Sequence, residues 1–224
     1  MAAQSDMPVW YAAYGSNLLT ERFLAYITGG PCRYSSRSYR GCADKHPPLK
    51  DMPYEFCREL YFSKSSKTWG NGGVAFITPE ETVSAMTYGR CYLISLQQFI
   101  DITLQENGLD PARGVVSLDP VALSHAGSVL LMPESDDLWY NRVLYCGTLD
   151  DIPVLTITAS HGENSRFVKP DAAYLRTIFY GLSQSWGLDN RTIIYYLIEK
   201  KGISGNYSAD DLQDMAEKWK SSIL

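Results

Sequence analysis

The sequence Pro8-Val-Trp-Tyr-Ala-Ala-Tyr-Gly-Ser-Asn-Leu18 joins an apolar run to a turn that contains one glycine. A nearly continuous apolar run over residues 8–14 predicts a strand buried on both faces. From Leu18 onward the apolar residues recur at helical spacing, and Gly29-Gly30 ends that pattern. The stretch therefore predicts a strand, a tight turn and a helix in succession.

The turn itself is a candidate binding site for an anion. The first backbone N–H groups of a helix have no partner within the helix and lie at the positive end of its dipole. A glycine at this point lets a ligand approach the backbone closely. The candidate binding residues are Tyr14, Gly15, Ser16, Asn17 and Leu18, and the anion is a carboxylate or a phosphate. The alternative is that Ser16 or Asn17 only caps the helix, as such residues often do.

The remaining periodicities predict a mixture of strands and helices without regular alternation, which indicates an α+β fold. The predicted strands cover residues 59–63, 73–78, 84–94, 115–123, 127–132, 139–147 and 152–158. Pro79-Glu80-Glu81-Thr82 is expected to join 73–78 to 84–94, and Asp150-Asp151 to join the last two strands. The predicted helices cover residues 18–28, 96–107, 170–186, 189–200 and 208–222.

The length of 224 residues and the ordinary composition predict one domain, 1–224, with its core at 8–188. Residues 31–58 carry prolines, cysteines and basic residues without periodicity, so a long irregular excursion is expected there. This segment is locally positive, and it either covers the site and meets a second carboxylate or is a solvated basic loop. Its basic residues are Arg33, Arg37, Arg40, Lys45 and Lys50.

Residues 189–224 look like a helical tail added to the core. An apolar stripe along the last predicted helix is typical of a core-facing surface or a homodimer contact, and an interaction face is a third reading. The stripe consists of Leu212, Met215, Trp219 and Ile223.

Charge and cysteine usage limit the partners and the compartment. The formal net charge of −5 excludes a general basic surface, so neither nucleic acid nor an anionic membrane is expected as a partner. Five widely spaced cysteines indicate reduced thiols and a cytoplasmic protein. No apolar run approaches the roughly 20 residues that cross a bilayer.

Two catalytic alternatives find little support in the spacing of residues. Cys32, Cys42, His46 and Cys57 lack the close cysteine pairs of zinc modules. Ser160-His161 lies in a glycine-containing loop, but the chain has no Gly-x-Ser-x-Gly elbow. We expect neither a metal nor a cofactor.

Glu106 is the candidate catalytic residue. On a helical wheel for 96–107 it projects between Phe99 and Ile102, inside the apolar arc, whereas the polar arc holds Gln97, Gln98, Asp101 and Gln105. A desolvated carboxyl favours its protonated form, which suits a general acid/base near neutral pH. The alternatives are a frayed helix end or a structural ion pair with Arg90 or Arg113.

These features, in this order, resemble the γ-glutamyl cyclotransferase-like family, which also includes plant avirulence-induced proteins. The family pattern has the turn Tyr14–Leu18, a glycine-rich strand, a strand with a glycine before a helix, and a glutamate toward the end of that helix. Here Trp69–Ile77, Tyr88–Ser95 and Glu106 match the last three. Residues 153–158 and 170–181, with Tyr174, also look like family elements, so the resemblance covers about 9–188.

The resemblance implies a small mixed, β-barrel-like sheet with flanking helices. It also implies a cyclotransferase that acts on a γ-glutamyl peptide or amine and releases 5-oxoproline and an amine without a cofactor. In that reading Glu106 is the general acid/base, and Tyr14 to Leu18 together with Tyr174 bind the small-molecule substrate. The alternative is a non-catalytic module of the same fold that binds a small carboxylate.

Overall fold

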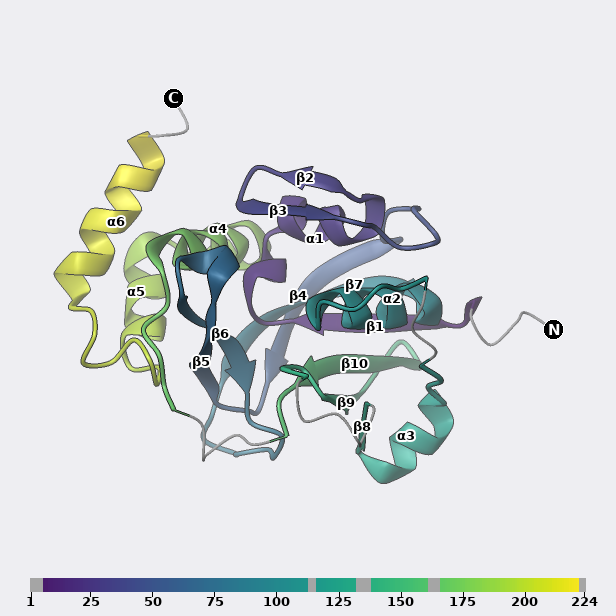
Figure 1. Cartoon of the computed structure of the whole chain (residues 1–224). Helices are drawn as coiled ribbons and strands as arrows, with labels where there is room; N and C mark the ends of the chain where they lie inside the picture. Colours follow the sequence, from purple (N-terminus) through teal and green to yellow (C-terminus); the bar gives the residue numbers. More distant parts are fainter. Residues whose placement is uncertain (1–5, 113–115, 132–137, 161–165, 222–224) are drawn as a thin grey trace.

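The computed structural model describes residues 6–112, 116–131, 138–160 and 166–221. Its centre is a six-stranded mixed sheet with the strand order β4-β7-β1-β10-β9-β8 (Figure 1). β1 pairs in parallel with β10 and antiparallel with β7. The strands, in that order, are Lys50–Phe56, Thr87–Ser95, Pro8–Ala13, Ile152–Thr158, Arg142–Leu149 and Ser128–Leu130.

β1 is buried on both faces, as its apolar run predicted. Trp10 and Ala12 belong to one hydrophobic cluster, whereas Val9, Tyr11 and Ala13 belong to a second cluster. This alternation follows from the period of two in a strand, which sends successive side chains to opposite faces. β1 therefore divides the core into two layers, and the turn that follows it starts at the boundary between them.

The two layers are built from different elements. On one face α1 (Thr20–Thr28) and α2 (Leu96–Glu106) pack together with the hairpin of β2 (Gly30–Cys32) and β3 (Ser35–Tyr39). On the other face lie the ribbon of β5 (Leu60–Ser66) and β6 (Gly72–Ile77) and three helices. These helices are α4 (Ala172–Trp186), α5 (Asn190–Ile198) and α6 (Ala209–Ser221), with α6 at the left edge of Figure 1.

The α+β class with helices flanking a mixed sheet is confirmed, but the sheet is open and not barrel-like. β4 and β8 form its two edges, and the described residues supply no strand that joins them. The predicted hairpin between 73–78 and 84–94 is also wrong. β6 pairs with β5 in a separate ribbon, and β7 instead pairs with β1 and β4.

The strand predicted at 115–123 is wrong, because this region contains α3 (Pro120–Ala126); residue 115 lies outside the described part of the chain. The Asp119 carboxylate accepts the backbone N–H groups of Val121 and Ala122, and Pro120 occupies the first helical turn. An Asp-Pro pair is a strong start signal for a helix, and here it outweighs the β-branched Val116 and Val121 on either side of it.

The irregular excursion predicted at 31–58 is wrong as well, because the segment contains β2, β3 and β4. β4 is an edge strand, where the missing N–H of Pro53 costs little. β3 is polar in sequence, but its last residue, Tyr39, is buried in the second cluster. Backbone pairing, which the side-chain pattern does not report, makes these segments regular.

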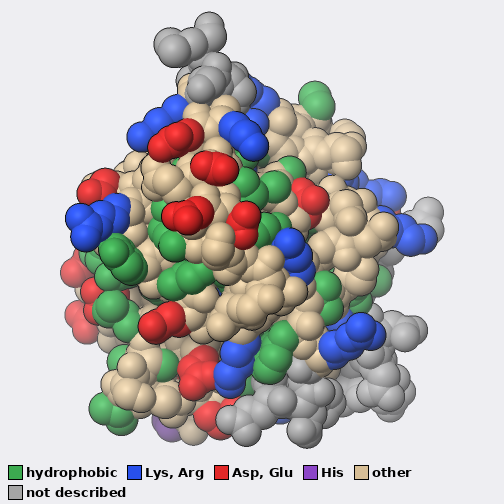
Figure 2. All heavy atoms as spheres, turned by 90° about the vertical axis from the view of Figure 1, so that its left-hand side faces the viewer, with side chains coloured by type: hydrophobic (Ala, Val, Ile, Leu, Met, Phe, Trp, Pro, Cys, Tyr) green, Lys and Arg blue, Asp and Glu red, His purple; other side chains and the backbone are tan. Residues whose placement is uncertain are grey.

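The predicted tail at 189–224 is part of the core and not an appendage. Ile193 and Leu197 of α5 and Leu212 and Trp219 of α6 are buried in the first cluster. The apolar stripe of α6 therefore packs inside the molecule, and its predicted last member, Ile223, lies outside the described residues. Figure 2 views this side, where acidic and basic side chains stand beside one another on the outer surface.

Within the described residues, no helix has both the length and the apolar character needed to cross a bilayer.

Candidate functional site

The turn after β1 opens onto a cleft of about 670 Å³, a volume that includes its open mouth. The walls come from the turn, α1, the β2–β3 hairpin, the end of α2, the β5–β6 ribbon and α4. Most of the lining is aromatic or polar. The residues on which the argument rests are Gly15, Ser16, Asn17, Arg22, Arg37, Tyr39, Trp69, Glu106 and Tyr174.

The turn is a short 3-10 helix over Ser16–Leu18, closed by a hydrogen bond of 3.0 Å from the Leu18 N–H to the Gly15 carbonyl. A Cβ atom placed on Gly15 would lie 2.8 Å from the Tyr174 hydroxyl oxygen and 3.2 Å from the Ala75 Cβ. Close packing against Tyr174 and Ala75 therefore requires glycine at this position.

Tyr174 reaches the turn from α4. Its oxygen accepts the Ala75 N–H at 3.0 Å, and it also interacts with the backbone N–H of Ser16. Burial raises the pKa of Tyr174 to about 12, although these two N–H groups act in the opposite direction. The hydroxyl is thus protonated at neutral pH, and its proton is available to a ligand because backbone donors occupy the oxygen.

Glu106 is the last residue of α2 and lies half-buried in the wall of the cleft. The Asn17 Nδ2 donates to its Oε1 at 2.8 Å, so the turn and the carboxylate are joined directly. The helix does not fray before Glu106, because the N–H of the next residue, Asn107, still bonds to the carbonyls of Thr103 and Leu104. At the other end of the helix, Ser95 and Gln98 form the predicted capping box. The frayed helix end is therefore wrong as an explanation of Glu106.

Among the described residues, Glu106 is held by the hydrogen bond from Asn17 and not by the alternative ion pair with Arg90. Arg90 pairs with Asp51 instead, and Arg113 lies outside the described residues. Asn17 also donates to the Tyr11 hydroxyl at 3.2 Å, and its Oδ1 is buried without a hydrogen-bond partner in the described part of the chain. The Asn17 amide therefore fixes Glu106 with one end and leaves an acceptor at the other.

The polar arc of α2 does not face solvent, because the segment between β3 and β4 covers it. Gln98, Asp101 and Gln105 are all buried. The Ala43 N–H donates to the Asp101 carboxylate at 2.8 Å, and the Gly41 N–H donates to the Gln105 Oε1 at 3.2 Å. These side chains satisfy the backbone of an irregular segment, which anchors the hairpin above the cleft.

Arg22 is a site residue that sequence reasoning missed. It is 3% exposed, and its guanidinium carbon lies 4.7 Å and 4.5 Å from the ring centres of Tyr26 and Tyr39. Its Nη2 donates to the Tyr26 hydroxyl at 3.2 Å, but its Nε and Nη1 have no hydrogen-bond partner among the described residues. Aromatic contacts contribute about 0.5–2 kcal/mol each, whereas burying a charge costs several kcal/mol.

A signal for Arg22 was present in the sequence. Arg22 and Tyr26 are four residues apart in the predicted helix, so they lie on one face of it. Apolar spacing predicts which side of the helix faces the core, but it does not indicate that a basic residue on the same side is buried there.

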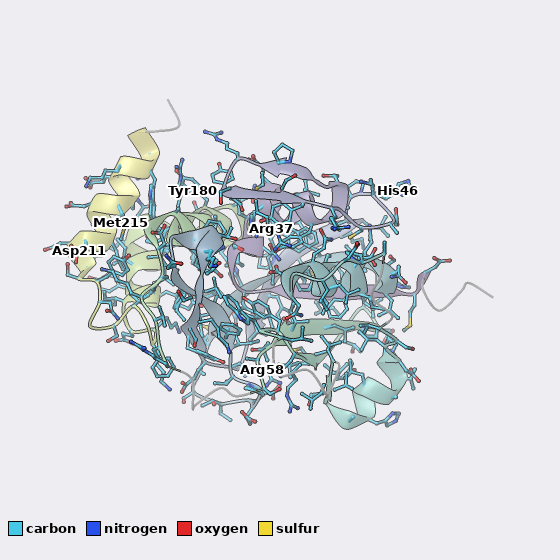
Figure 3. All side chains as sticks on the ribbon, viewed as in Figure 1. Arg37, His46, Arg58, Tyr180, Asp211 and Met215 are labelled. Atoms are coloured by element: carbon cyan, nitrogen blue, oxygen red, sulfur yellow. The ribbon has the colours of Figure 1, made fainter. Side chains whose placement is uncertain are left out.

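Of the basic residues in 31–58, Arg37 lines the cleft. Its Nη2 donates to the Gln105 carbonyl at 3.2 Å, and Figure 3 shows Arg37 between the β2–β3 hairpin and α2. The other basic residues point elsewhere: Arg40 pairs with Asp110 at 2.5 Å, and the Lys45 amine donates to the Thr28 carbonyl. The segment is therefore in part a wall of the site.

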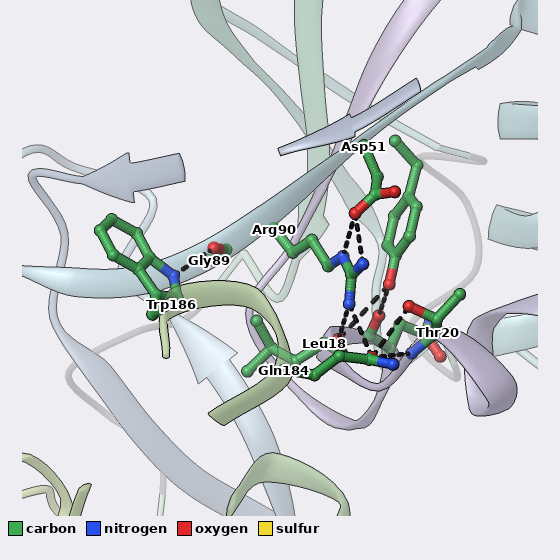
Figure 4. Close-up of polar contacts among 9 residues, drawn as sticks. Leu18, Thr20, Asp51, Gly89, Arg90, Gln184 and Trp186 are labelled. Carbon is green, nitrogen blue, oxygen red and sulfur yellow. Dashed lines mark hydrogen bonds and ion pairs between the residues drawn. The ribbon is translucent and has the colours of Figure 1, made fainter. Parts of the chain in front are cut away.

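A polar network holds the turn from behind (Figure 4). The Arg90 Nη1 donates to the Leu18 carbonyl at 3.3 Å and to the Gln184 Oε1 at 2.8 Å, and its guanidinium pairs with Asp51. The same Gln184 oxygen accepts the Thr20 N–H and hydroxyl. These contacts tie β7, α4 and the start of α1 to the turn.

Leu18 does not line the cleft, although it was a candidate binding residue. Its side chain is buried against Gly181, where a Cβ atom would lie 2.4 Å from the Leu18 Cβ. The Tyr92 hydroxyl donates to the Asn17 carbonyl at 2.8 Å, on the same side. Tyr14, by contrast, does line the cleft, with its hydroxyl bonded to the Ile157 carbonyl.

The cysteines of the metal alternative do not form a site. Cys32 and Cys42 are buried, Cys57 is exposed, and His46 pairs with Asp44 at 2.6 Å. Across the described ranges, no group of His, Cys, Asp and Glu is arranged to hold a metal ion. All five cysteines are free. Ser160 bonds to the Asn141 side chain, and His161 lies outside the described residues.

The architecture has a counterpart among solved structures. A structure of γ-glutamyl cyclotransferase superposes on 94% of this chain and 99% of its own, with a TM-score of 0.50 and 17% sequence identity. This chain has the γ-glutamyl cyclotransferase fold. The structure of an uncharacterized protein from Homo sapiens also aligns, over 94% of this chain and 98% of the human chain, at a TM-score of 0.49 and 17% identity.

In sequence, no family model matches the chain. It is 35% identical over 204 residues to histone deacetylase 5 from Arabidopsis thaliana, an alignment that covers 86% of this chain. The chain spans 31% of the length of that relative.

Proposed function

We propose that this chain is a cyclotransferase that converts a γ-glutamyl peptide or amine to 5-oxoproline and a free amine. The observation that carries the proposal is the hydrogen bond of 2.8 Å between Asn17 and Glu106, which places a carboxylate beside the Gly15 turn in an open cleft. The γ-glutamyl cyclotransferase fold supports the same reading. The name histone deacetylase 5 describes a protein of which 31% aligns here, so the proposal rests on the cleft.

The cleft offers groups that match an amino-acid head. Glu106 and the Asn17 Oδ1 are acceptors for an ammonium group, whereas the turn and the Tyr174 hydroxyl are donors for a carboxylate or a carbonyl. A γ-glutamyl group carries an α-ammonium, an α-carboxylate and a γ-carbonyl within a few bonds of one another. The donors and acceptors of the cleft can therefore hold all three at once.

The proposed reaction needs one proton acceptor that later becomes a donor. Glu106 takes a proton from the α-ammonium, and the freed nitrogen attacks the γ-carbonyl carbon to close a five-membered ring. The bond from that carbon to the leaving nitrogen then breaks as Glu106 returns the proton to that nitrogen. The ring nitrogen gives up its second proton through Glu106 to the released amine, which leaves as an ammonium ion. Because both reacting groups belong to one molecule, the protein mainly folds the substrate into a reactive conformer.

The test is a panel of γ-glutamyl peptides and γ-glutamyl amines, incubated with purified protein and analysed by mass spectrometry for 5-oxoproline. Glu106→Gln protein is the matched control, because glutamine keeps the size and the acceptor oxygen but cannot shuttle a proton. Formation of 5-oxoproline by the wild type alone supports the proposal. Ligand binding without any 5-oxoproline would instead favour a non-catalytic module that binds small carboxylates.

A further inference from the structure

Arg22 is the feature of the cleft that the proposed reaction does not use. Its guanidinium is buried, lines the cleft, and leaves Nε and Nη1 without a hydrogen-bond partner among the described residues. Glu106 is near enough to interact with it electrostatically, but Asn17 and not Arg22 holds that carboxylate. A buried guanidinium with two free donors is suited to an anion that enters from outside.

The ring contacts of Arg22 explain its orientation but not its free donors. Tyr26, Tyr39 and Trp69 surround the guanidinium carbon at 4.7, 4.5 and 5.8 Å from their ring centres. Aromatic faces stabilise a cation without accepting its in-plane N–H groups. The rings therefore fix the plane of the guanidinium and leave its Nε and Nη1 donors unsatisfied.

The charge of the cleft indicates which ligand fits. Its charged lining residues in the described part of the chain are Arg22, Arg37 and Glu106, so the cleft carries one net positive charge. A γ-glutamyl amine is a neutral zwitterion, whereas a γ-glutamyl amino acid has a second carboxylate and one net negative charge. The second compound balances the cleft and the first does not.

The geometry points to Arg22 as a specificity-determining residue that binds a second carboxylate of the ligand, carried by the leaving amino acid. This inference rests on the proposed function for the identity of the γ-glutamyl group. It assigns the α-carboxylate to the turn and the second carboxylate to Arg22, with Arg37 at the same wall. Arg22 then selects γ-glutamyl amino acids over γ-glutamyl amines.

The test uses two ligands that differ by one carboxylate, γ-glutamyl-alanine and γ-glutamyl-ethylamine. Their dissociation constants are measured by calorimetry on Glu106→Gln protein, so that turnover does not deplete the ligand. We expect γ-glutamyl-alanine to bind about 10-fold or more tightly than γ-glutamyl-ethylamine, the range of a charge-assisted hydrogen bond. Adding Arg22→Gln should remove most of this difference by weakening γ-glutamyl-alanine alone.

Two further variants make the result specific. Arg22→Lys keeps the charge but loses the planar set of donors, so it should keep part of the preference for γ-glutamyl-alanine. If Arg22→Gln does not fold, the reduced preference in Arg22→Lys tests the role of Arg22 instead. Arg33→Gln makes the same charge change at an exposed position of the β2–β3 hairpin and should change neither constant. Thermal midpoints of all variants are measured in parallel.

Equal weakening of both ligands by Arg22→Gln would overturn the inference, because Arg22 would then bind the carboxylate that the two share or only shape the cleft. Unchanged binding of both would overturn it as well. The proposed function fails separately, namely when wild-type protein forms no 5-oxoproline from either ligand. In that case the role of Arg22 is still decided by the two dissociation constants, namely by whether γ-glutamyl-alanine binds more tightly than γ-glutamyl-ethylamine and whether the Arg22 variants lose this preference.

Discussion

The two sides of the turn at residues 15–18 differ in how completely their polar groups are satisfied. On the back, Arg90 and Tyr92 bond to the carbonyls of Leu18 and Asn17. On the cleft side, the Asn17 Oδ1 and two nitrogens of Arg22 are buried without partners among the described residues. A binding surface with unpaired polar groups is costly, and the saturated side supplies the rigidity that keeps it in place.

The two sides draw on partly different elements, and α1 and α4 contribute to both. The cleft side adds α2, the β2–β3 hairpin and the β5–β6 ribbon, whereas the back adds β4 and β7. Changes on the cleft side should therefore alter ligand binding and turnover with little effect on stability. Changes on the back should alter stability first and binding second.

The largest effect is expected at Glu106. Glu106→Gln keeps the bond to Asn17 but cannot carry a proton, so turnover of a verified γ-glutamyl substrate should fall by about 10²-fold or more. The dissociation constant should change far less, and initial rates together with calorimetry check both. A glutamine variant that works at nearly the wild-type rate would make Glu106 a structural residue.

At the turn, Gly15→Val should abolish binding because its side chain would collide with the Tyr174 hydroxyl, which lies 2.8 Å from the position of a Cβ atom. Ser16→Ala removes only a side-chain oxygen and should leave the dissociation constant within about 5-fold, since backbone groups make the contact. A glutamyl analogue is titrated into both variants. Loss of binding in Ser16→Ala that matches Gly15→Val would refute a backbone site.

On the back of the turn, Arg90→Met should lower the free energy of unfolding by about 1–2 kcal/mol, a discounted value because Asp51 is partly exposed. It should weaken ligand binding by a few-fold through the loosened Leu18 carbonyl. Urea unfolding and calorimetry measure the two effects. Arg40→Met, at an exposed pair with Asp110, is the control and should change neither.

The smallest effect concerns alkaline pH. Burial raises the pKa of Tyr174 from 10.0 to about 12, so the folded state holds the proton more tightly than the unfolded state. The associated stability is present below pH 10 and is lost as the pH rises from about 10 to about 12. Tyr174→Phe should therefore reduce the alkaline loss of stability, measured by urea unfolding on either side of pH 10. If the free energy of unfolding of the variant falls as steeply with pH as that of the wild type, other buried tyrosines cause the alkaline loss of stability.

Local sequence patterns were sufficient to predict the structures whose hydrogen bonds join residues close together in the chain. The capping box of Ser95 and Gln98 was predicted, and so was the hairpin turn at Asp150-Asp151, whose φ values of 51° and 61° suit its tight geometry. The turn after β1 and the helix that brings Glu106 to its last position were also predicted from short-range spacing. Each depends on hydrogen bonds between residues a few positions apart.

Patterns failed where the partner lies far along the chain. β4 forms because the distant strand β7 supplies its backbone hydrogen bonds, and α5 and α6 join the core because α4 packs against both. The β2–β3 hairpin is an exception, because its polar strands pair locally. The helical wheel predicted the polar arc of α2. It did not predict that residues 41–46 cover this arc and bury it. Periodicity reports which side chains share a face and not what covers that face.

The sequence by itself determined the central strand, the glycine turn and the glutamate at the end of α2, because each is encoded within a few turns of chain. Only the tertiary structure decided that Asn17 holds Glu106, residues 89 apart, and that Leu18 faces away from the cleft. It also decided that Arg22 is buried with free donors. Such contacts depend on how separate elements pack, and the free energy of packing is shared among residues distant in sequence.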